Sequence, residues 1–163
     1  MTESSEGELF SWKKIGVKRE RNHETLISRL NKDNRDIFVF LKDTMIFSAM
    51  IGYHYAEKRP LKGGTIEILL ETYATDEKDS FIYLLSLLEE RDALILKDDR
   101  LKGSVSVFEE YCNAGLYQIE SWLDENPGDP SGVDTLLDKI YERLCDDQDK
   151  TIVDNSLVEE PNI

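Results

Sequence analysis

The sequence has few of the features that mark a secreted or membrane-spanning protein. It contains two cysteines, Cys112 and Cys145, and both fall on apolar faces of expected helices, so we expect reduced thiols. Its apolar runs stay short of the roughly 18 residues that a membrane span requires. The acidic opening MTESSEGELF lacks the basic and apolar regions of a secretory signal. We therefore expect a cytoplasmic protein.

Motifs for catalysis and cofactor binding are also missing. The two histidines, His23 and His54, have no partner at metal-ligand spacing, and the sequence has no CxxC motif. Gly63-Gly64 lacks the GK[ST] ending of a phosphate-binding loop. Adjacent acids such as Asp98-Asp99 are typical of a solvated loop. We predict no catalytic residue, no metal site and no cofactor, and hence a protein that is not an enzyme.

The net charge of −14 is unevenly distributed. Residues 1–62 carry 12 Lys/Arg against 9 Asp/Glu, whereas residues 63–163 carry 8 against 25. Because the acidic second part repels a phosphate backbone, we expect no DNA binding by the domain as a whole. The basic first part can be a solvated arm, a phosphate contact, or a docking arm for an acidic partner or a second copy. The candidate binding residues are Lys13, Lys14, Lys18, Arg19, Arg21, Lys58, Arg59 and Lys62.

The stretch 34–61 is the one around which the chain is organised. Residues 37–51 form an almost continuous apolar run, which is typical of a helix in the middle of a core. We predict this helix from about Asn34 to Tyr53 or Tyr55. The only polar residues of the run are Lys42, Asp43, Thr44 and Ser48.

Two shorter helices are predicted on either side of an ambiguous segment. The first covers 22–31, and the second covers 77–91 with Thr75 and Asp76 as caps. Between them, 65–73 fits either a short strand or a helical turn, because its alternation of apolar and acidic residues is broken at Leu69. The expected buried stripe of the second helix is Phe81, Leu84, Leu85 and Leu88.

The clearest helical periodicity follows Ser106. Ser106 and Glu109 fit a capping box, Gly115 lies on the apolar stripe and should let another helix come close, and 126–130 ends the helix. Ser131 can cap a last helix. The stripe of the first helix is Phe108, Tyr111, Cys112, Gly115, Leu116, Ile119, Trp122 and Leu123; that of the last is Val133, Leu136, Leu137, Ile140, Tyr141 and Leu144.

These elements predict an all-α fold. About five helices should pack around the central apolar helix, with at most a minor short strand pair. The predicted organisation is a flexible basic arm at 1–21, a single helical domain at 22–145, and an acidic disordered tail at 146–163.

Two blocks carry a resemblance to a known family. The first runs from Asp36 to Tyr53 and continues in Arg59-Pro60-Leu61. The second is 108–116, FEEYCNAGL, where the family pattern is close to FEEYANGGL. On these blocks and their spacing, the chain resembles the DNA phosphorothioation-dependent (dnd) system-associated protein 4 family over roughly residues 22–125. Cys112 and Ala114 depart from the family pattern.

The resemblance implies a small bacterial protein encoded beside genes for sulfur modification of the DNA backbone and the linked restriction. It implies an accessory role in a phage-defence locus and assigns no catalytic residue. An architectural reading is that Pro60 fixes a turn, Glu110 pairs with Arg59, and Asn113 satisfies a backbone group. The motif residues that it singles out are Pro60, Glu109, Glu110, Tyr111, Asn113 and Gly115.

We therefore expect a non-enzymatic accessory or adaptor subunit of a defence system. Its partner would be a larger nuclease, ATPase or modification enzyme, bound through the helical surface, and a second copy of the chain is a further candidate partner. Two alternatives stay open. One is a DNA-contacting or modification-sensing module that uses the basic N-terminal part. The other is an acidic regulator or DNA mimic.

Overall fold

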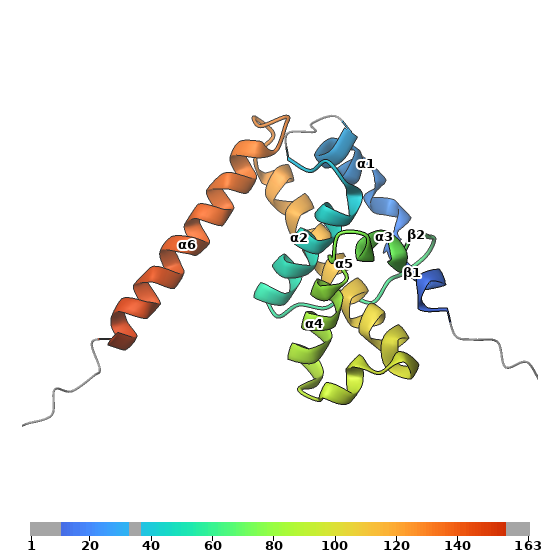
Figure 1. Ribbon diagram of the computed structural model, residues 1–163. Coiled ribbons are helices and arrows are strands. Elements are labelled where there is room, and N and C mark those ends of the chain that lie inside the picture. The colour runs from blue at the N-terminus through green and yellow to red at the C-terminus, as the bar shows by residue number, and fades with distance from the viewer. Residues whose placement is uncertain (1–10, 33–36, 156–163) are drawn as a thin grey trace, which may run out of the picture. The chain divides into compact units, whose positions relative to one another are not determined.

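Helices dominate the structure (Figure 1). The computed structural model describes residues 11–32 and 37–155. Within these residues a two-stranded sheet is the only sheet, which confirms the mainly α prediction. The principal elements are β1 (Gly16–Glu20), α1 (Glu24–Ile27), α2 (Leu41–His54), β2 (Thr65–Leu69), α3 (Leu70–Ala74), α4 (Ser80–Glu90), α5 (Leu101–Glu125) and α6 (Val133–Asn155). Short 3₁₀ helices are η1 (Trp12–Lys14), η2 (Arg21–His23), η4 (Ala93–Leu96) and η5 (Asp98–Arg100), and η3 (Ser28–Lys32) is a π-helical turn.

The chain divides into two compact units, residues 1–118 and residues 119–163, with the boundary inside α5. The predicted ends differ from the structure where they can be compared. Strand β1 lies within the arm expected to be flexible, and α6 continues to Asn155, past the point where the acidic tail was expected to begin. The rest of both predicted ends, 1–10 and 156–163, lies outside the described residues.

The two strands form an antiparallel ribbon, with Gly16 opposite Leu69 and Glu20 opposite Thr65. The alternation seen in 65–73 therefore makes a strand over its first five residues, and the break at Leu69 is where α3 takes over. Val17, on β1 itself, is fully buried. The helix predicted at 22–31 appears as η2, α1 and η3 in succession.

Helices α2 and α5 cross at very short range. A Cβ atom on Gly52 would fall 2.1 Å from the carbonyl oxygen of Tyr111, and one on Gly115 would fall 1.7 Å from that of Ser48. Two glycines, one from each helix, thus let the backbones touch. The close approach predicted at Gly115 is confirmed, and α2 is its partner.

The central helix α2 is shorter than predicted, and it buries more polar side chains than expected. It begins at Leu41 rather than near Asn34; residues 37–40 are not helical, and 33–36 lie outside the described residues. Its buried residues include Lys42, Thr44 and Ser48 as well as apolar ones. Lys42 can be buried because its ammonium group donates to Thr72 O, Thr75 Oγ1 and Asp76 Oδ1.

Helix α4 turns a different face inward from the one predicted. It begins at Ser80, so Thr75 and Asp76 precede it without capping it, and its buried residues are Ile82, Leu85 and Ser86. Ser86 Oγ donates to the carbonyl oxygens of Ile82 and Ser104, so a small polar side chain lies where α4 meets α5. The expected stripe residues Phe81, Leu84 and Leu88 are exposed.

Helix α5 begins at Leu101, five residues before the predicted cap. Leu101 and Val105 are buried, so the apolar stripe extends toward the N-terminus and Ser106 lies inside the helix. The predicted capping box at Ser106 is therefore wrong, whereas the predicted end after Glu125 is confirmed.

In residues 119–163, the turn before α6 is organised by Asp129. Its Oδ2 accepts hydrogen bonds from the N–H and the hydroxyl of Thr135, both at 2.8 Å, and its Oδ1 accepts from Gly132 N at 3.0 Å. The predicted cap Ser131 accepts from Val133 N at 3.2 Å. Leu136 is buried on α6, whereas Leu137, Ile140, Tyr141 and Leu144 of the predicted stripe are exposed.

Candidate functional site

A buried polar cluster joins β1 to the middle of α5. Glu20, His23 and Asn113 are each at most 2% exposed. Asn113 Nδ2 donates to Glu20 Oε1 at 3.0 Å, and Asn113 Oδ1 lies 3.0 Å from His23 Nε2. Since the amide nitrogen faces the carboxylate, the amide oxygen faces the imidazole, and His23 carries its proton on Nε2. Glu20 and His23 are neighbours in sequence, and the fold brings Asn113, about 90 residues further along the chain, against both of them.

The same asparagine holds the loop that follows α2. Its Nδ2 also lies 3.2 Å from the carbonyl oxygen of Arg59 and 3.5 Å from that of Pro60, and Arg59 N donates to Glu110 O at 3.0 Å. Lys62 N donates to Glu20 Oε1 at 2.7 Å. The architectural reading of Asn113 is thus confirmed. Glu110 meets Arg59 through backbone atoms rather than through the expected side-chain pair.

Tyr117 connects the cluster to the surface. Its hydroxyl donates to Glu20 Oε2 at 2.8 Å and accepts from Asn22 Nδ2 at 2.9 Å. The guanidinium of Arg59 lies 4.7 Å from the ring centroid, and His23 packs its edge against the ring at 4.5 Å. Arg59 therefore stacks on an aromatic face while half of its side chain stays exposed.

Glu20 is held ionised by its neighbours. Burial alone would raise its pKa, but hydrogen bonds from Lys62 N–H, Tyr117, Asn113 and Asn22 together hold the pKa below its ordinary value. A carboxylate with this many donors is a fixed acceptor rather than a proton donor. The cluster is therefore suited to fixing β1, α5 and the 59–62 loop in one arrangement.

Tyr111 anchors a second contact of the family motif. Its hydroxyl donates to Glu89 Oε2 at 2.6 Å, and Glu89 Oε1 accepts from Lys58. The hydrogen bond from Lys58, followed by that from Tyr111, lowers the pKa of Glu89. Tyr53 packs against Tyr111 at 5.5 Å. The motif residue Tyr111 thus links α5 to α4 and to the loop after α2.

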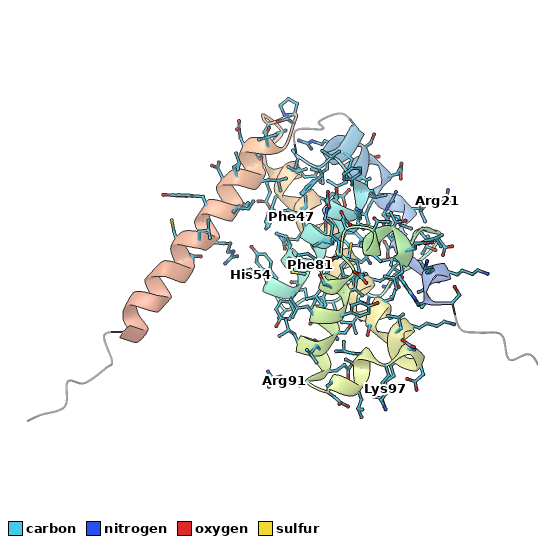
Figure 2. All side chains as sticks on the ribbon, viewed as in Figure 1. Arg21, Phe47, His54, Phe81, Arg91 and Lys97 are labelled. Atoms are coloured by element: carbon cyan, nitrogen blue, oxygen red, sulfur yellow. The ribbon has the colours of Figure 1, made fainter. Side chains whose placement is uncertain are left out.

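The predicted basic residues do not form one surface. Arg19 is 4% exposed and donates to Glu24 Oε2 at 2.6 Å, while Lys13 pairs with Glu71 and Lys58 with Glu89. Arg19 is the one buried member of the predicted set. Lys13 and Lys58 are exposed although they pair with carboxylates, and Lys14, Lys18, Arg21, Arg59 and Lys62 are exposed as well. Figure 2 shows Arg21 pointing outward beside the β1–β2 ribbon.

A polar hollow of about 800 Å³ lies beside β1 and the first turns of α5, both within residues 1–118. It is lined by three lysines, Lys14, Lys18 and Lys102, and by the carboxylates of Glu67 and Glu109. Glu109 Oε1 accepts from Lys18 N at 2.6 Å, which satisfies the outer edge of the ribbon. Burial raises the pKa of Glu109 to about 7.

An apolar groove of about 400 Å³ lies along α4 and η4. Its lining includes Phe81, Leu84 and Leu96, which are 38%, 48% and 46% exposed. Leu88, one helical turn after Leu84 on α4, is exposed as well. Figure 2 labels Phe81, one of the lining residues, on α4.

Sequence reasoning missed several of these features. His23 was considered only as a possible metal ligand and Glu20 was not singled out, yet both are buried and hydrogen-bonded. Tyr117 and Lys102 were not singled out as binding residues. Apolar neighbours on both sides, Val17 and Leu26-Ile27, were the signal that this part of the chain enters the core.

In residues 11–32 and 37–155, no three His, Cys, Asp or Glu side chains are grouped so that they could hold a metal ion. Among the same residues, no helix is both long and apolar enough to cross a bilayer.

The described residues form a mainly helical protein in which Tyr111, Asn113 and Gly115 make contacts between elements, with an apolar groove and a lysine-lined hollow at the surface of residues 1–118. The chain belongs to the family of DNA sulphur modification system-associated protein 4, whose family model matches residues 16–156. Comparisons with curated proteins and with solved structures give no significant match.

Proposed function

We propose that this protein is a non-enzymatic accessory subunit of a DNA sulphur modification system with a linked anti-phage restriction function. In this role it binds a larger protein of the system, a nuclease, ATPase or modification enzyme. Membership of a system-associated family supports the setting. The observation that carries the proposal is the apolar groove on α4 and η4.

The groove has the composition of a docking surface for a helix. Along α4, Phe81, Leu84 and Leu88 follow one another at three and four residues and are all exposed. Leu96 from η4 adds a further exposed apolar side chain to the lining. Contiguous exposed apolar side chains of this kind mark interaction sites, and a groove with helical spacing accepts the apolar face of an amphipathic helix.

Acidic side chains next to the groove define the chemistry of the partner. Tyr83 lines the groove, and its pKa is raised by burial and then by the negative charges of Asp79 and Asp98. Asp79 directly precedes Ser80 and Asp98 lies two residues after Leu96, and both of these neighbours line the groove, so the two aspartates flank it. A partner helix with apolar anchors flanked by Lys or Arg side chains complements this surface.

The test is co-purification from cells that carry the linked modification and restriction genes. The full chain, with a purification tag, is expected to retain one of their larger products after nuclease treatment. The variant Leu84→Glu/Leu96→Glu should reduce the yield of that product at least ~10-fold, because two charges then face the apolar side of the partner. The matched control Val39→Glu/Leu69→Glu changes two exposed apolar residues outside the groove and should leave the yield within ~2-fold.

The same experiment can overturn the proposal. Loss of the product on nuclease treatment would show that DNA mediates the association. Equal yields from the groove variant and the control would show that the groove does not contact the partner. The charge variant Asp79→Lys/Asp98→Lys tests the partner chemistry separately. It should weaken binding of a basic helix. Asp98 is exposed, whereas Asp79 is half-buried at the start of α4, so urea denaturation of the variant checks that the fold is retained.

A second candidate function is contact with DNA. Arg21, Arg59 and Lys62 are exposed near Tyr117, and a guanidinium stacked on an aromatic ring presents a preorganised donor to a phosphate. The variant Arg59→Ala/Lys62→Ala should then reduce DNA retardation and lower its salt dependence. The third alternative, an acidic regulator or DNA mimic, stays a prediction that rests on net charge.

A further inference from the structure

The hollow beside β1 combines cationic side chains from two distant parts of the chain. Lys14 follows Trp12 in η1, Lys18 lies on β1, and Lys102 lies in the first turn of α5. Among the described residues, none of these three ammonium groups pairs with a carboxylate within 4.0 Å, whereas Lys13 and Lys58 do so. The fold thus gathers three available cations around one open space.

One face of α5 contributes to this space. Lys102, Ser106 and Glu109 all line the hollow, and their spacing of four and three residues places them on the same side of the helix. They belong to its first turns, where the helix dipole adds a partial positive charge. An anionic group is therefore favoured near Lys102 by a side chain and by the helix itself.

Two carboxylates are fixed in the same lining. Glu67 lies across from Lys18 in the ribbon and packs against Gly16, where a Cβ atom would fall 2.2 Å from Glu67 Oε2. Glu109 is held by the hydrogen bond from Lys18 N. Carboxylates repel a long polyanion, but they accept hydrogen bonds from hydroxyl and amino groups. The lining therefore suits a small molecule that carries both phosphate and donor groups.

The size of the hollow agrees with such a molecule. A water molecule takes up about 30 Å³ of liquid, and a phosphate group is only a few times larger. A hollow of about 800 Å³ therefore has room for much more than one phosphate group. We propose that this hollow is a nucleotide-binding site in which Lys14, Lys18 and Lys102 hold the phosphates and Glu67 and Glu109 accept hydrogen bonds from the sugar or the base. This site lies apart from the α4 groove, so nucleotide binding and partner binding can be tested separately.

Isothermal titration of the full chain with ATP, GTP and inorganic pyrophosphate tests the proposal. We expect saturable binding of at least one nucleotide, weaker binding of pyrophosphate, and weaker binding still of adenosine. The variant Lys18→Ala/Lys102→Ala should raise the Kd of the nucleotide at least ~10-fold. The control Lys97→Ala/Lys139→Ala removes the same charge at positions outside the hollow and should leave the Kd within ~2-fold.

Three results would overturn the assignment. The first is the absence of saturable binding by ATP, GTP and pyrophosphate alike. The second is an equal effect of the two double variants, which would reduce the interaction to net charge. The third is tighter binding of a ten-nucleotide single-stranded DNA than of any nucleotide, with the same dependence on Lys18 and Lys102, because the phosphates would then belong to a nucleic-acid strand.

Discussion

Gly115 on α5 has no room for a side chain, because a Cβ atom there would fall 1.7 Å from the carbonyl oxygen of Ser48 on α2. The obstacle is backbone, so it cannot rotate away as a side-chain tip would. Gly52 faces the backbone of Tyr111 in the same way. The two helices can come this close because each glycine has a hydrogen atom where any other residue has a Cβ atom.

Replacing this glycine should be strongly destabilising. For Gly115→Ala we expect a loss of about 3 kcal/mol or more in the free energy of unfolding, since α2 or α5 must move to accept the methyl group. Gly103→Ala is the matched control in the same helix, because the nearest atom to a Cβ there is 3.9 Å away. That control should be neutral or should stabilise by about 0.5–1 kcal/mol. Urea denaturation at pH 7 measures both, and equal midpoints would contradict this account of the crossing.

The buried cluster provides the second prediction. Asn113→Ala removes the amide that donates to Glu20 and to the loop carbonyl of Arg59, and leaves a buried carboxylate with fewer donors. We expect a loss of about 2–4 kcal/mol in the free energy of unfolding. Asn22→Ala is the control. It deletes an exposed hydrogen bond to Tyr117 and the smallest of the four hydrogen-bond contributions to the lowered pKa of Glu20, so it should cost less than Asn113→Ala, about 1 kcal/mol. Similar effects of the two variants in the same urea titration would count against a special role for Asn113.

Local periodicity predicted much of the helical framework and little of the cluster. The stripe of α5, the approach at Gly115 and the end after Glu125 follow from apolar spacing and from Pro127, which are properties of neighbouring residues. The contact between His23 and Asn113 spans 90 residues, so no local pattern signals it. The face of α4 was misassigned because Ser86, a small polar residue, is the one that packs against α5.

Glu109 should make the protein less stable as the pH rises. Its folded-state pKa of about 7 is above the ordinary value of 4.5, because burial disfavours the charged form. Folding then stabilises the protonated acid, and this contribution is present below pH 4.5 and is lost as the pH rises through about 7. The charged groups that face Glu109 are Lys18, Glu110 and Glu67, and of these Lys18 opposes the shift.

Glu109→Gln isolates this effect. At pH 8.5 the free energy of unfolding of the variant should exceed that of the wild type by about 2 kcal/mol. This difference should shrink toward pH 5.5. The control Glu110→Gln removes the neighbouring negative charge while Glu109 stays in place. A difference between Glu109→Gln and the wild type that stays constant from pH 5.5 to 8.5 would contradict the perturbed ionisation.

The turn before α6 provides the last prediction, which concerns residues 119–163 alone. Asp129 is 7% exposed and accepts hydrogen bonds from the backbone N–H groups of Gly132 and Thr135. The N–H and hydroxyl of Thr135, with Ser131 and Gly132, lower the pKa of Asp129 to about 2 against the opposing effect of burial. A carboxylate in this position satisfies N–H groups at the start of a helix, which have no partner within the helix itself.

Asp129→Asn should therefore loosen the first turn of α6 without unfolding the rest of the chain. We expect amide hydrogen exchange at Thr135 and Gly132 to accelerate about 5- to 30-fold, which corresponds to about 1–2 kcal/mol of lost capping. Asp134→Asn is the matched control, since Asp134 is exposed in the same turn, and it should change these rates less than ~3-fold. Because the folded-state pKa of Asp129 lies below the unfolded value, its stabilising contribution is present at pH 7 and is lost as the pH falls from about 4 toward 2. Exchange at Thr135 that is equally slow in Asp129→Asn and in the wild type at pH 7 would show that other groups cap this helix.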